Sequence, residues 1–233
     1  MPVCSFDFVN DGKKHTICLV GGGGKTTVMY ELAVAWAASG RRVLVLTSTH
    51  ILRPADGSFA ADAAAVQKLW QQGRYAVIGT PEAATGKLTA PPQFLYEAMK
   101  PQADVILCEA DGSKHQPCKA PAAHEPVLLP ESDIVLAVAG MDALGNSLQQ
   151  VCQRPQLAAE LLDCSADKII DAQMLAALLL SEQGARKNVG THGFYIVLNK
   201  CDLISAAQQE ELRWLLVSAG IDGRRIWLRE RGE

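Results

Sequence analysis

Four consecutive glycines followed by Lys-Thr-Thr, at residues 21–27, constrain this chain more than any other feature. The apolar residues 17–20 before them are typical of a buried parallel strand, which the glycines end because they make the chain turn. Glycine readily adopts positive φ, so consecutive N–H groups can converge on one anion. A helix is expected from Lys25 to about residue 40, and its N-terminal N–H groups would face the same anion. The stretch therefore predicts a nucleotide phosphate site.

Each residue of this stretch has an expected role. The glycine amides would bind phosphate oxygens, Lys25 would contact the β- and γ-phosphates, and Thr26 would bind Mg²⁺ through its hydroxyl. The standard pattern G-x-x-x-x-G-K-[ST] is not met, because Leu19 stands where its first glycine would be. The shorter G-x-x-G-K-T resembles the loops of Mur ligases and, less closely, the GKTT loops of the SIMIBI class of P-loop proteins. The expected phosphate-binding residues are Gly21, Gly22, Gly23, Gly24, Lys25, Thr26 and Thr27.

Length and charge exclude several classes of function. The 233 residues fit one domain over 1–233. The net charge of −3 gives no basic field for a polyanion, so nucleic acid is not an expected partner. Residues 1–10 carry no secretion signal and no apolar run reaches membrane-spanning length, so we expect a cytoplasmic protein without a membrane partner. The seven cysteines lack zinc-type spacing and fit reduced thiols, and a homodimer stays open.

The order of apolar runs and amphipathic stretches predicts the fold class. We expect an α/β fold of the three-layer P-loop NTPase type, with a mostly parallel sheet and helices on both faces. The region at about 52–92 would be an insert that carries substrate specificity or serves as a lid or packing segment. Strands are expected at about 17–20, 43–46, 75–78, 104–108, 134–139, 193–198 and 225–228. Helices are expected at about 25–40, 62–71, 93–99, 155–162, 206–218 and, from Ser165 as N-cap, 165–181.

Acidic residues follow the apolar run that ends at Cys108. Glu109 and Asp111, beside the phosphate loop, would hold Mg²⁺ through water and orient an attacking water. The form E-x-x-G at 109–112 resembles the third motif of SIMIBI GTPases that serve metalloenzyme assembly. Beyond it, Lys114 and Lys119 either stabilise charge on a transferred phosphoryl group or are solvated, as lone lysines more often are. The expected catalytic residues are Lys25, Glu109, Asp111 and Lys114, and the expected metal ligands are Thr26, Glu109 and Asp111.

Two further side chains have open roles. His50 follows the second expected strand, at the edge where open α/β sheets bind ligands, and is either a ligand contact or a loop hydrogen-bonding residue. Cys118 stands between Lys114 and Lys119. Those charges would lower the pKa of its thiol, or Cys118 is an ordinary loop thiol.

The apolar run 193–198 leads directly into Asn199-Lys200-Cys201-Asp202, which has the form N-K-x-D. In GTPases this motif binds guanine: the Asp accepts from the ring N1–H and the exocyclic amine, the Asn supports the base edge, and the Lys packs over the ring. The alternative is a helix-initiating loop capped by Asp202. A Ser-Ala-type loop, the fifth GTPase motif, is not evident at 229–233. The expected base-binding residues are Asn199, Lys200 and Asp202, with GTP preferred and ATP as the alternative.

Taken together, these segments resemble the selenium cofactor biosynthesis family typified by YqeC, over nearly the whole chain. The resemblance is carried by residues 20–27, 47–50, 87–91, 109–114, 119–121, 124–126, 140–145 and 199–202. It implies a role in maturing selenium-dependent molybdenum hydroxylases, with such an enzyme or its cofactor as partner.

Three functions are consistent with these residues. The first is a P-loop nucleoside triphosphatase that uses GTP and Mg²⁺ to mature a selenium- or molybdenum-containing cofactor. The second is an ATP-dependent kinase or ligase, favoured by the short Mur-like loop. The third is a non-catalytic nucleotide-gated chaperone, whose affinity for its client would change with the bound nucleotide.

Overall fold

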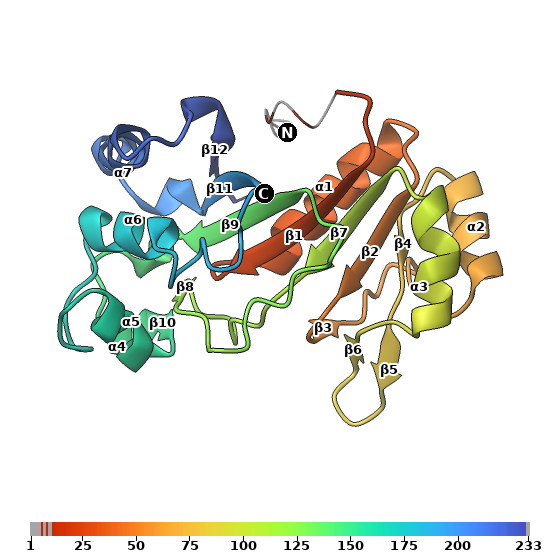
Figure 1. The fold of residues 1–233 in the computed structure, drawn as a ribbon, viewed down its shortest axis with the longest axis horizontal. Coiled ribbons are helices and arrows are strands. Elements are labelled where there is room, and N and C mark those ends of the chain that lie inside the picture. The colour runs from red at the N-terminus through yellow and green to blue at the C-terminus, as the bar shows by residue number, and fades with distance from the viewer. Residues whose placement is uncertain (1–5, 7, 9–10, 232–233) are drawn as a thin grey trace.

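A seven-stranded parallel sheet forms the centre of the molecule (Figure 1). The computed structural model describes Phe6, Phe8 and residues 11–231; the rest of residues 1–10, where the sequence predicts no secretion signal, and residues 232–233 lie outside the described residues. The strand order is β12-β11-β9-β1-β7-β2-β4. The strands are β1 (His15–Gly21), β2 (Val43–Thr47), β4 (Ala76–Val77), β7 (Val105–Glu109), β9 (Ile134–Gly140), β11 (Gly193–Asn199) and β12 (Ile226–Arg229). The strands predicted from the apolar runs are confirmed.

Helices cover both faces of this sheet, because successive strand residues point to opposite sides. On one face, α1 (Lys25–Ala38) packs Val28, Leu32 and Trp36 on the strands. The other face is covered by α2 (Ala63–Gln71) and α3 (Gln93–Met99) toward β4, and by α6 (Ala172–Leu180) and α7 (Ala206–Ser218) toward β12 (Figure 1). The predicted three-layer α/β fold is confirmed.

One predicted helix begins later than expected. The helix predicted from Ser165 is wrong in its first part, since α6 begins at Ala172 with Asp171 as its N-cap. The backbone of residues 166–170 instead hydrogen-bonds to residues 145–149, which removes it from a helix. The other predicted helices correspond to α1, α2, α3, α5 (Pro155–Leu161) and α7.

Two small sheets lie outside the main one. β3 (Ile51–Leu52), β6 (Lys87–Thr89) and β5 (Thr80–Glu82) form an antiparallel sheet that projects beyond the end of β2 (Figure 1). Between β3 and β5 in sequence, α2 and β4 belong to the main sheet and its helical layer. The second small sheet pairs β8 (Cys118–Lys119) with β10 (Cys152–Gln153) in parallel. The remaining elements are α4 (Leu148–Val151), η2 (Lys100–Gln102), η3 (Met141–Ala143), η4 (Cys201–Leu203) and η5 (Gly223–Arg225).

Within the part of the chain that the structure describes, no helix combines the length and apolar character needed to cross a membrane.

Candidate functional site

The expected functional residues lie together at the carboxyl edge of the sheet. β1 lies between β7 and β9, with Leu19 opposite Glu109. β11 lies on the other side of β9, with Asn199 opposite Gly140. Because these strands are parallel, the glycine loop, the acids after β7 and the N-K-x-D segment meet at one edge.

The glycine loop packs so closely on its neighbours that side chains do not fit. Gly23 has φ of 70°, and a Cβ built on it would lie 2.0 Å from the backbone N of Gly140. A Cβ on Gly22 would lie 2.6 Å from the carbonyl oxygen of Gln116. Glycine is therefore required here by the close approach of the backbone as well as by φ.

The backbone amides of the loop fall into two groups. The N–H of Gly21 donates to Oδ2 of Asp111 at 3.1 Å, and those of Gly22 and Gly23 donate to backbone carbonyls at 2.9 and 2.8 Å. The amides of residues 24–27, at the start of α1, have no acceptor among the described residues. Because unpaired N–H groups and the helix dipole attract anions, these four amides are the ones available to a phosphate.

Lys25 is buried and lies across the loop. The residue is 2% exposed, and its Nζ donates to the carbonyl oxygen of Gly21 at 2.7 Å. The same Nζ lies 3.1 Å from Oδ1 of Asp111 and 3.9 Å from Oε1 of Glu109. A buried ammonium requires such partners because removing it from water is costly. To contact a β- or γ-phosphate, Lys25 would have to exchange Asp111 for the phosphate.

Thr26 and Glu109 form the candidate metal site. Thr26 Oγ1 donates to Oε2 of Glu109 at 2.6 Å, so the lone pairs of the hydroxyl oxygen stay available to a cation. Burial raises the pKa of Glu109 above its usual value, and the charge of Lys25 and the Thr26 hydrogen bond only partly oppose this. Among the described residues, no group of three or more His, Cys, Asp or Glu is placed to hold a metal. Mg²⁺ would therefore take most of its ligands from phosphate and water.

Asp111 belongs to a series of alternating charges that runs away from the loop. Its Oδ2 lies 3.2 Å from Nζ of Lys119, and that Nζ lies 2.8 Å from Oε2 of Glu125. Arg154 in turn donates to both carboxylate oxygens of Glu125, at 2.7 and 3.2 Å. We call this series the buried charge chain; its members are Glu109, Lys25, Asp111, Lys119, Glu125 and Arg154.

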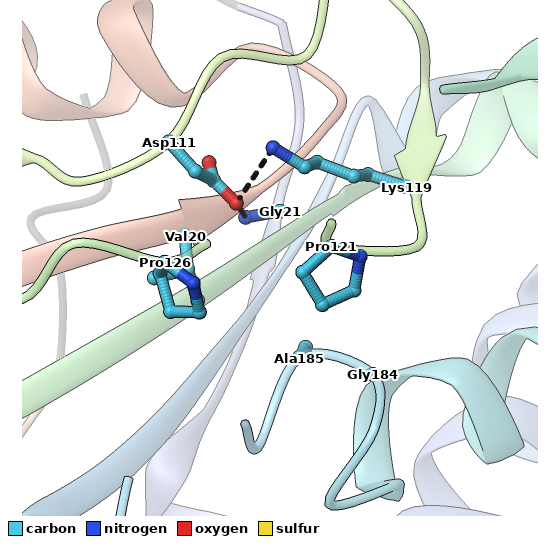
Figure 2. Close-up of a pocket in the computed structure, with 8 residues that line it drawn as sticks. All are labelled: Val20, Gly21, Asp111, Lys119, Pro121, Pro126, Gly184 and Ala185. Carbon is cyan, nitrogen blue, oxygen red and sulfur yellow. Dashed lines mark hydrogen bonds and ion pairs between the residues drawn. The ribbon is translucent and has the colours of Figure 1, made fainter. Parts of the chain in front are cut away.

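A small cavity adjoins the buried charge chain (Figure 2). It measures about 10 Å³ and lies between Asp111 and Lys119 on one side and Pro121, Pro126 and residues 184–185 on the other. A space of this size holds about one water molecule. A nucleotide is far too large for it. The unpaired amides at the start of α1 lie outside this cavity's lining.

The two lysines after β7 have different environments. Lys119 is 5% exposed and also donates to the carbonyl oxygen of Gly112 at 2.6 Å, so it is held inside the protein. Lys114 is exposed, and no hydrogen bond or ion pair of its side chain occurs within the described chain. Of the two, Lys114 is the one free to approach a bound anion. His50 is likewise exposed at this edge, and its two expected roles stay open.

Cys118 is not an activated thiol. It is buried directly opposite Cys152 of β10, and a hydrogen bond with Cys152 together with burial raises the pKa of its thiol. The prediction that Lys114 and Lys119 lower this pKa is therefore wrong. The reason is that Lys119 points into the buried charge chain, while Lys114 is exposed to solvent.

Asn199 connects the glycine loop to the end of β12. It is 1% exposed, and its Nδ2 donates to the carbonyl oxygen of Gly23 at 2.6 Å. Its Oδ1 accepts from Nη1 of Arg229 at 2.6 Å, and Arg229 also donates to Glu31 of α1. The side chain expected to support a base edge thus holds the loop in place.

Replacing Asn199 by alanine is expected to lower the free energy of unfolding by about 2 kcal/mol, because the Gly23 carbonyl and Arg229 would both lose a buried partner. Denaturant unfolding measures this. Asn146→Ala is the matched control, since the side chain of Asn146 is exposed and donates only to nearby carbonyls. The free energy of unfolding of this control should change by no more than about 0.5 kcal/mol. Equal, small changes in both variants would contradict this role.

The other N-K-x-D side chains are also paired. Lys200 forms an ion pair with Asp142 at 2.6 Å. Asp202 is exposed and accepts from the backbone N–H of Arg231 at 2.9 Å and from its Nε at 2.6 Å. The backbone hydrogen bond from Arg231 is the main cause that holds the pKa of Asp202 below its usual value. A guanine bound by Asp202 would have to displace Arg231, which precedes the undescribed residues 232–233.

Glu125 is expected to contribute acid-sensitive stability. Burial alone would raise its pKa, but hydrogen bonds from Lys119 and from the Ala122 N–H, with the charge of Lys119 and a hydrogen bond from Arg154, hold the pKa below its ordinary value of 4.5. The contribution is complete above the unfolded-state pKa and is lost as pH falls through the lower folded-state pKa. Denaturant unfolding at several pH values between about 6 and 3 should therefore show that the free energy of unfolding falls less steeply with pH in Glu125→Gln than in the natural protein.

The control for that experiment is Glu160→Gln, at an exposed position of α5. Its pH profile should match that of the natural protein. Parallel profiles for all three proteins would contradict the assignment to Glu125.

The sequence assigned no role to three charged side chains of this region. Arg154 and Arg229 become visible only through their contacts with Glu125 and Asn199, and Glu125, which lies in the segment 124–126 of the family resemblance, gains its role through Lys119. The one local sequence signal is that Arg154 stands directly before Pro155, the first residue of α5. This signal predicts the start of a helix and gives no indication of an ion pair.

The fold and the loop define the class of this protein. A seven-stranded parallel sheet with helices on both faces, and a Gly-Lys-Thr loop between its first strand and first helix, make it an α/β protein with a P-loop NTPase-like three-layer fold. The chain belongs to the YqeC family: the family model described as "YqeC protein" matches residues 17–156. It is 33% identical over 232 residues to "Uncharacterized protein YqeC" of Escherichia coli (strain K12), covering 91% of this chain and 86% of that protein.

Proposed function

We propose that this protein binds a nucleoside triphosphate with Mg²⁺ at the glycine loop and hydrolyses or transfers its γ-phosphoryl group. The junction of β1 and α1 carries the proposal. There the unpaired amides of residues 24–27 lie beside Lys25, and Glu109 lies 2.6 Å from Thr26 Oγ1 and 3.9 Å from Lys25 Nζ. Donors for a polyphosphate and oxygen ligands for Mg²⁺ thus occur together.

Phosphoryl transfer depends mainly on orientation and charge stabilisation, which these residues can provide. Lys25 and the helix amides would neutralise the β- and γ-phosphates. Thr26 and Glu109 would hold Mg²⁺, which when bound neutralises charge on the phosphate oxygens, and Glu109 would orient the nucleophile. Asp111, paired with Lys25 and Lys119, would act on the loop instead. Lys114 would approach the transferred group from the solvent side.

The proposal is tested by measuring release of inorganic phosphate from GTP and ATP with and without Mg²⁺. Turnover that requires Mg²⁺ supports it. Absence of both binding and turnover for either nucleotide contradicts it.

For the base we propose guanine, on the strength of Asp202 in N-K-x-D at the same sheet edge. Calorimetric titration of GTP and ATP into the natural protein and Asp202→Ala tests this. The expected result is a preference for GTP that Asp202→Ala loses. Asp222→Ala is the control, because Asp222 forms a similar pair with Arg224 but precedes β12, at the opposite edge. A preference for ATP in all three proteins would exclude guanine.

A kinase or ligase is the second candidate, favoured by a surface pocket of ligand size. The pocket measures about 400 Å³, is lined by His124, Asn188 and His192 among others, and shares Pro126 with the cavity beside Asp111. It is a candidate acceptor site. Product analysis with γ-labelled nucleotide separates the two functions, because label on an organic acceptor indicates transfer and label on inorganic phosphate indicates hydrolysis.

The cellular role we propose is maturation of a selenium- or molybdenum-containing cofactor of a molybdenum hydroxylase, which is what the family resemblance implies. A nucleotide-gated chaperone would serve the same role without turnover. Capture of a purified molybdenum hydroxylase with and without nucleotide tests both. Capture that changes with the nucleotide while turnover is very slow favours the chaperone, and no capture in either state contradicts a direct partner role.

A further inference from the structure

The carboxylate of Asp111 lies where it engages two donors of the glycine loop. Its Oδ2 accepts from the Gly21 N–H at 3.1 Å, and its Oδ1 lies 3.1 Å from Nζ of Lys25. Asp111 is 1% exposed, so these contacts are made away from water. An amide and an ammonium directed at one anion are what a polyphosphate would also require. Of these two donors, Lys25 is the one that Asp111 holds and that a polyphosphate at the amides of residues 24–27 would also need.

Lys119 holds the same carboxylate from the other side. Its Nζ lies 3.2 Å from Oδ2 of Asp111 and 2.8 Å from Oε2 of Glu125. The two small strands fix this geometry, since Lys119 lies in β8 and Arg154 directly follows its partner β10. Arg154 then supplies the second positive charge on Glu125. Lys119 therefore pairs with two buried carboxylates at once. Its place in β8 does not depend on the position of Lys25.

Departure of Lys25 toward a phosphate would remove one of the two cations beside Asp111. A buried carboxylate without a cation is strongly destabilised. Lys119 remains in place and compensates that charge, and the adjoining cavity, which Asp111 lines, has room for about one water. The energetic cost of freeing Lys25 is thus set by how strongly Lys119 binds Asp111.

We propose that Asp111 closes the phosphate loop as an internal anion, and that Lys119 is the positioning residue that releases Lys25 from it when polyphosphate binds. This rests on the proposed function. Glu125 regulates the release, because it draws Lys119 away from Asp111. Two substitutions therefore act with opposite sign: removing the charge of Lys119 strengthens the hold of Asp111 on Lys25, and removing the charge of Glu125 weakens it.

The test is calorimetric titration of magnesium tripolyphosphate, a probe without a base, into four variants. Lys119→Met should bind about tenfold more weakly than the natural protein, and Glu125→Gln should bind more tightly. Asp111→Asn removes the internal anion, so Lys119→Met/Asp111→Asn should regain the affinity of Asp111→Asn alone. A purely structural role for Lys119 would leave the double variant weak. Thermal unfolding of each variant identifies loss of folded protein.

Lys187→Met is the control. Lys187 donates to the carbonyls of Ala122 and Ala123, beside Glu125, but contacts neither Asp111 nor Glu125. Its affinity should equal that of the natural protein. Unchanged affinity in Lys119→Met, or a double variant that stays weak, would overturn the inference while the proposed function stands. If the natural protein binds no tripolyphosphate, GTP or ATP, the proposed function fails and the inference fails with it. If Lys119→Met does not fold, the affinity of Glu125→Gln for magnesium tripolyphosphate is the deciding measurement. An affinity equal to or weaker than that of the natural protein would overturn the inference.

Discussion

Lys25→Met is expected to lower the affinity for a magnesium nucleoside triphosphate by at least about a hundredfold, the largest effect of any single substitution considered. The variant loses the buried ammonium that would contact the β- and γ-phosphates. It also leaves Glu109 and Asp111 with one cation fewer, and both carboxylates then repel the polyphosphate. The same loss should lower the free energy of unfolding by about 3 kcal/mol. Titration calorimetry and denaturant unfolding measure the two effects.

Lys25→Met/Asp111→Asn separates binding from folding. Removing the charge of Asp111 should restore most of the stability, because no unpaired charge is left at position 111 and Lys119 keeps its existing ion pair with Glu125. It should not restore affinity. Recovery of affinity together with stability would mean that Lys25 serves only the fold. The matched single control is Lys187→Met, which removes a lysine that donates only to loop carbonyls.

Glu109→Gln is expected to lower Mg²⁺-dependent turnover by about a hundredfold, with little change in nucleotide binding without the metal. Glutamine still accepts from Thr26 but supplies no negative charge to the ion. Burial raises the pKa of Glu109 in the protein without metal, so kcat/KM, which reports the free enzyme, should fall on acidification at a pH above the usual carboxylate range. The residual activity of Glu109→Gln should lack this fall. Phosphate release measured against pH and Mg²⁺ concentration checks both points.

Glu131→Gln is the control for Glu109. Its carboxylate is paired with Tyr96 and Lys100 and precedes β9, at the opposite edge of the sheet. Its turnover and pH profile should match those of the natural protein. A Glu109→Gln variant with unchanged Mg²⁺ dependence would remove Glu109 from the metal site and leave Asp111 as the acid to examine.

Much of the fold follows from the sequence because its strands are buried on both faces. A continuous apolar run such as 134–139 predicts a strand without knowledge of its neighbours, and the helix predicted at 206–218 matches the bounds of α7. Ser165 was misleading because its local signal for a helix is outweighed by backbone pairing with residues 145–149, which lie some twenty positions earlier. β8 and β10 are two residues long each and are defined by pairing with each other. No local sequence pattern predicts either strand.

At the site, the sequence predicts which residues gather but not how they pair. The strand ends bring Lys25, Glu109 and Asp111 together as expected. That Asp111 engages Lys119, and that Asn199 holds the carbonyl of Gly23, depends on side-chain contacts between segments far apart in the chain. Such contacts have no periodicity or spacing by which a sequence would reveal them. They add support of the glycine loop to the role expected for Asn199 at a base edge.

The central claim is that residues 21–27 form a polyphosphate site in which Lys25 carries the charge. Titration of magnesium tripolyphosphate into the natural protein and Lys25→Met tests it most directly, because no base contributes to the affinity. We expect saturable binding with one site in the natural protein and its loss in the folded variant. Absence of binding in the natural protein, or equal binding in both, would contradict it.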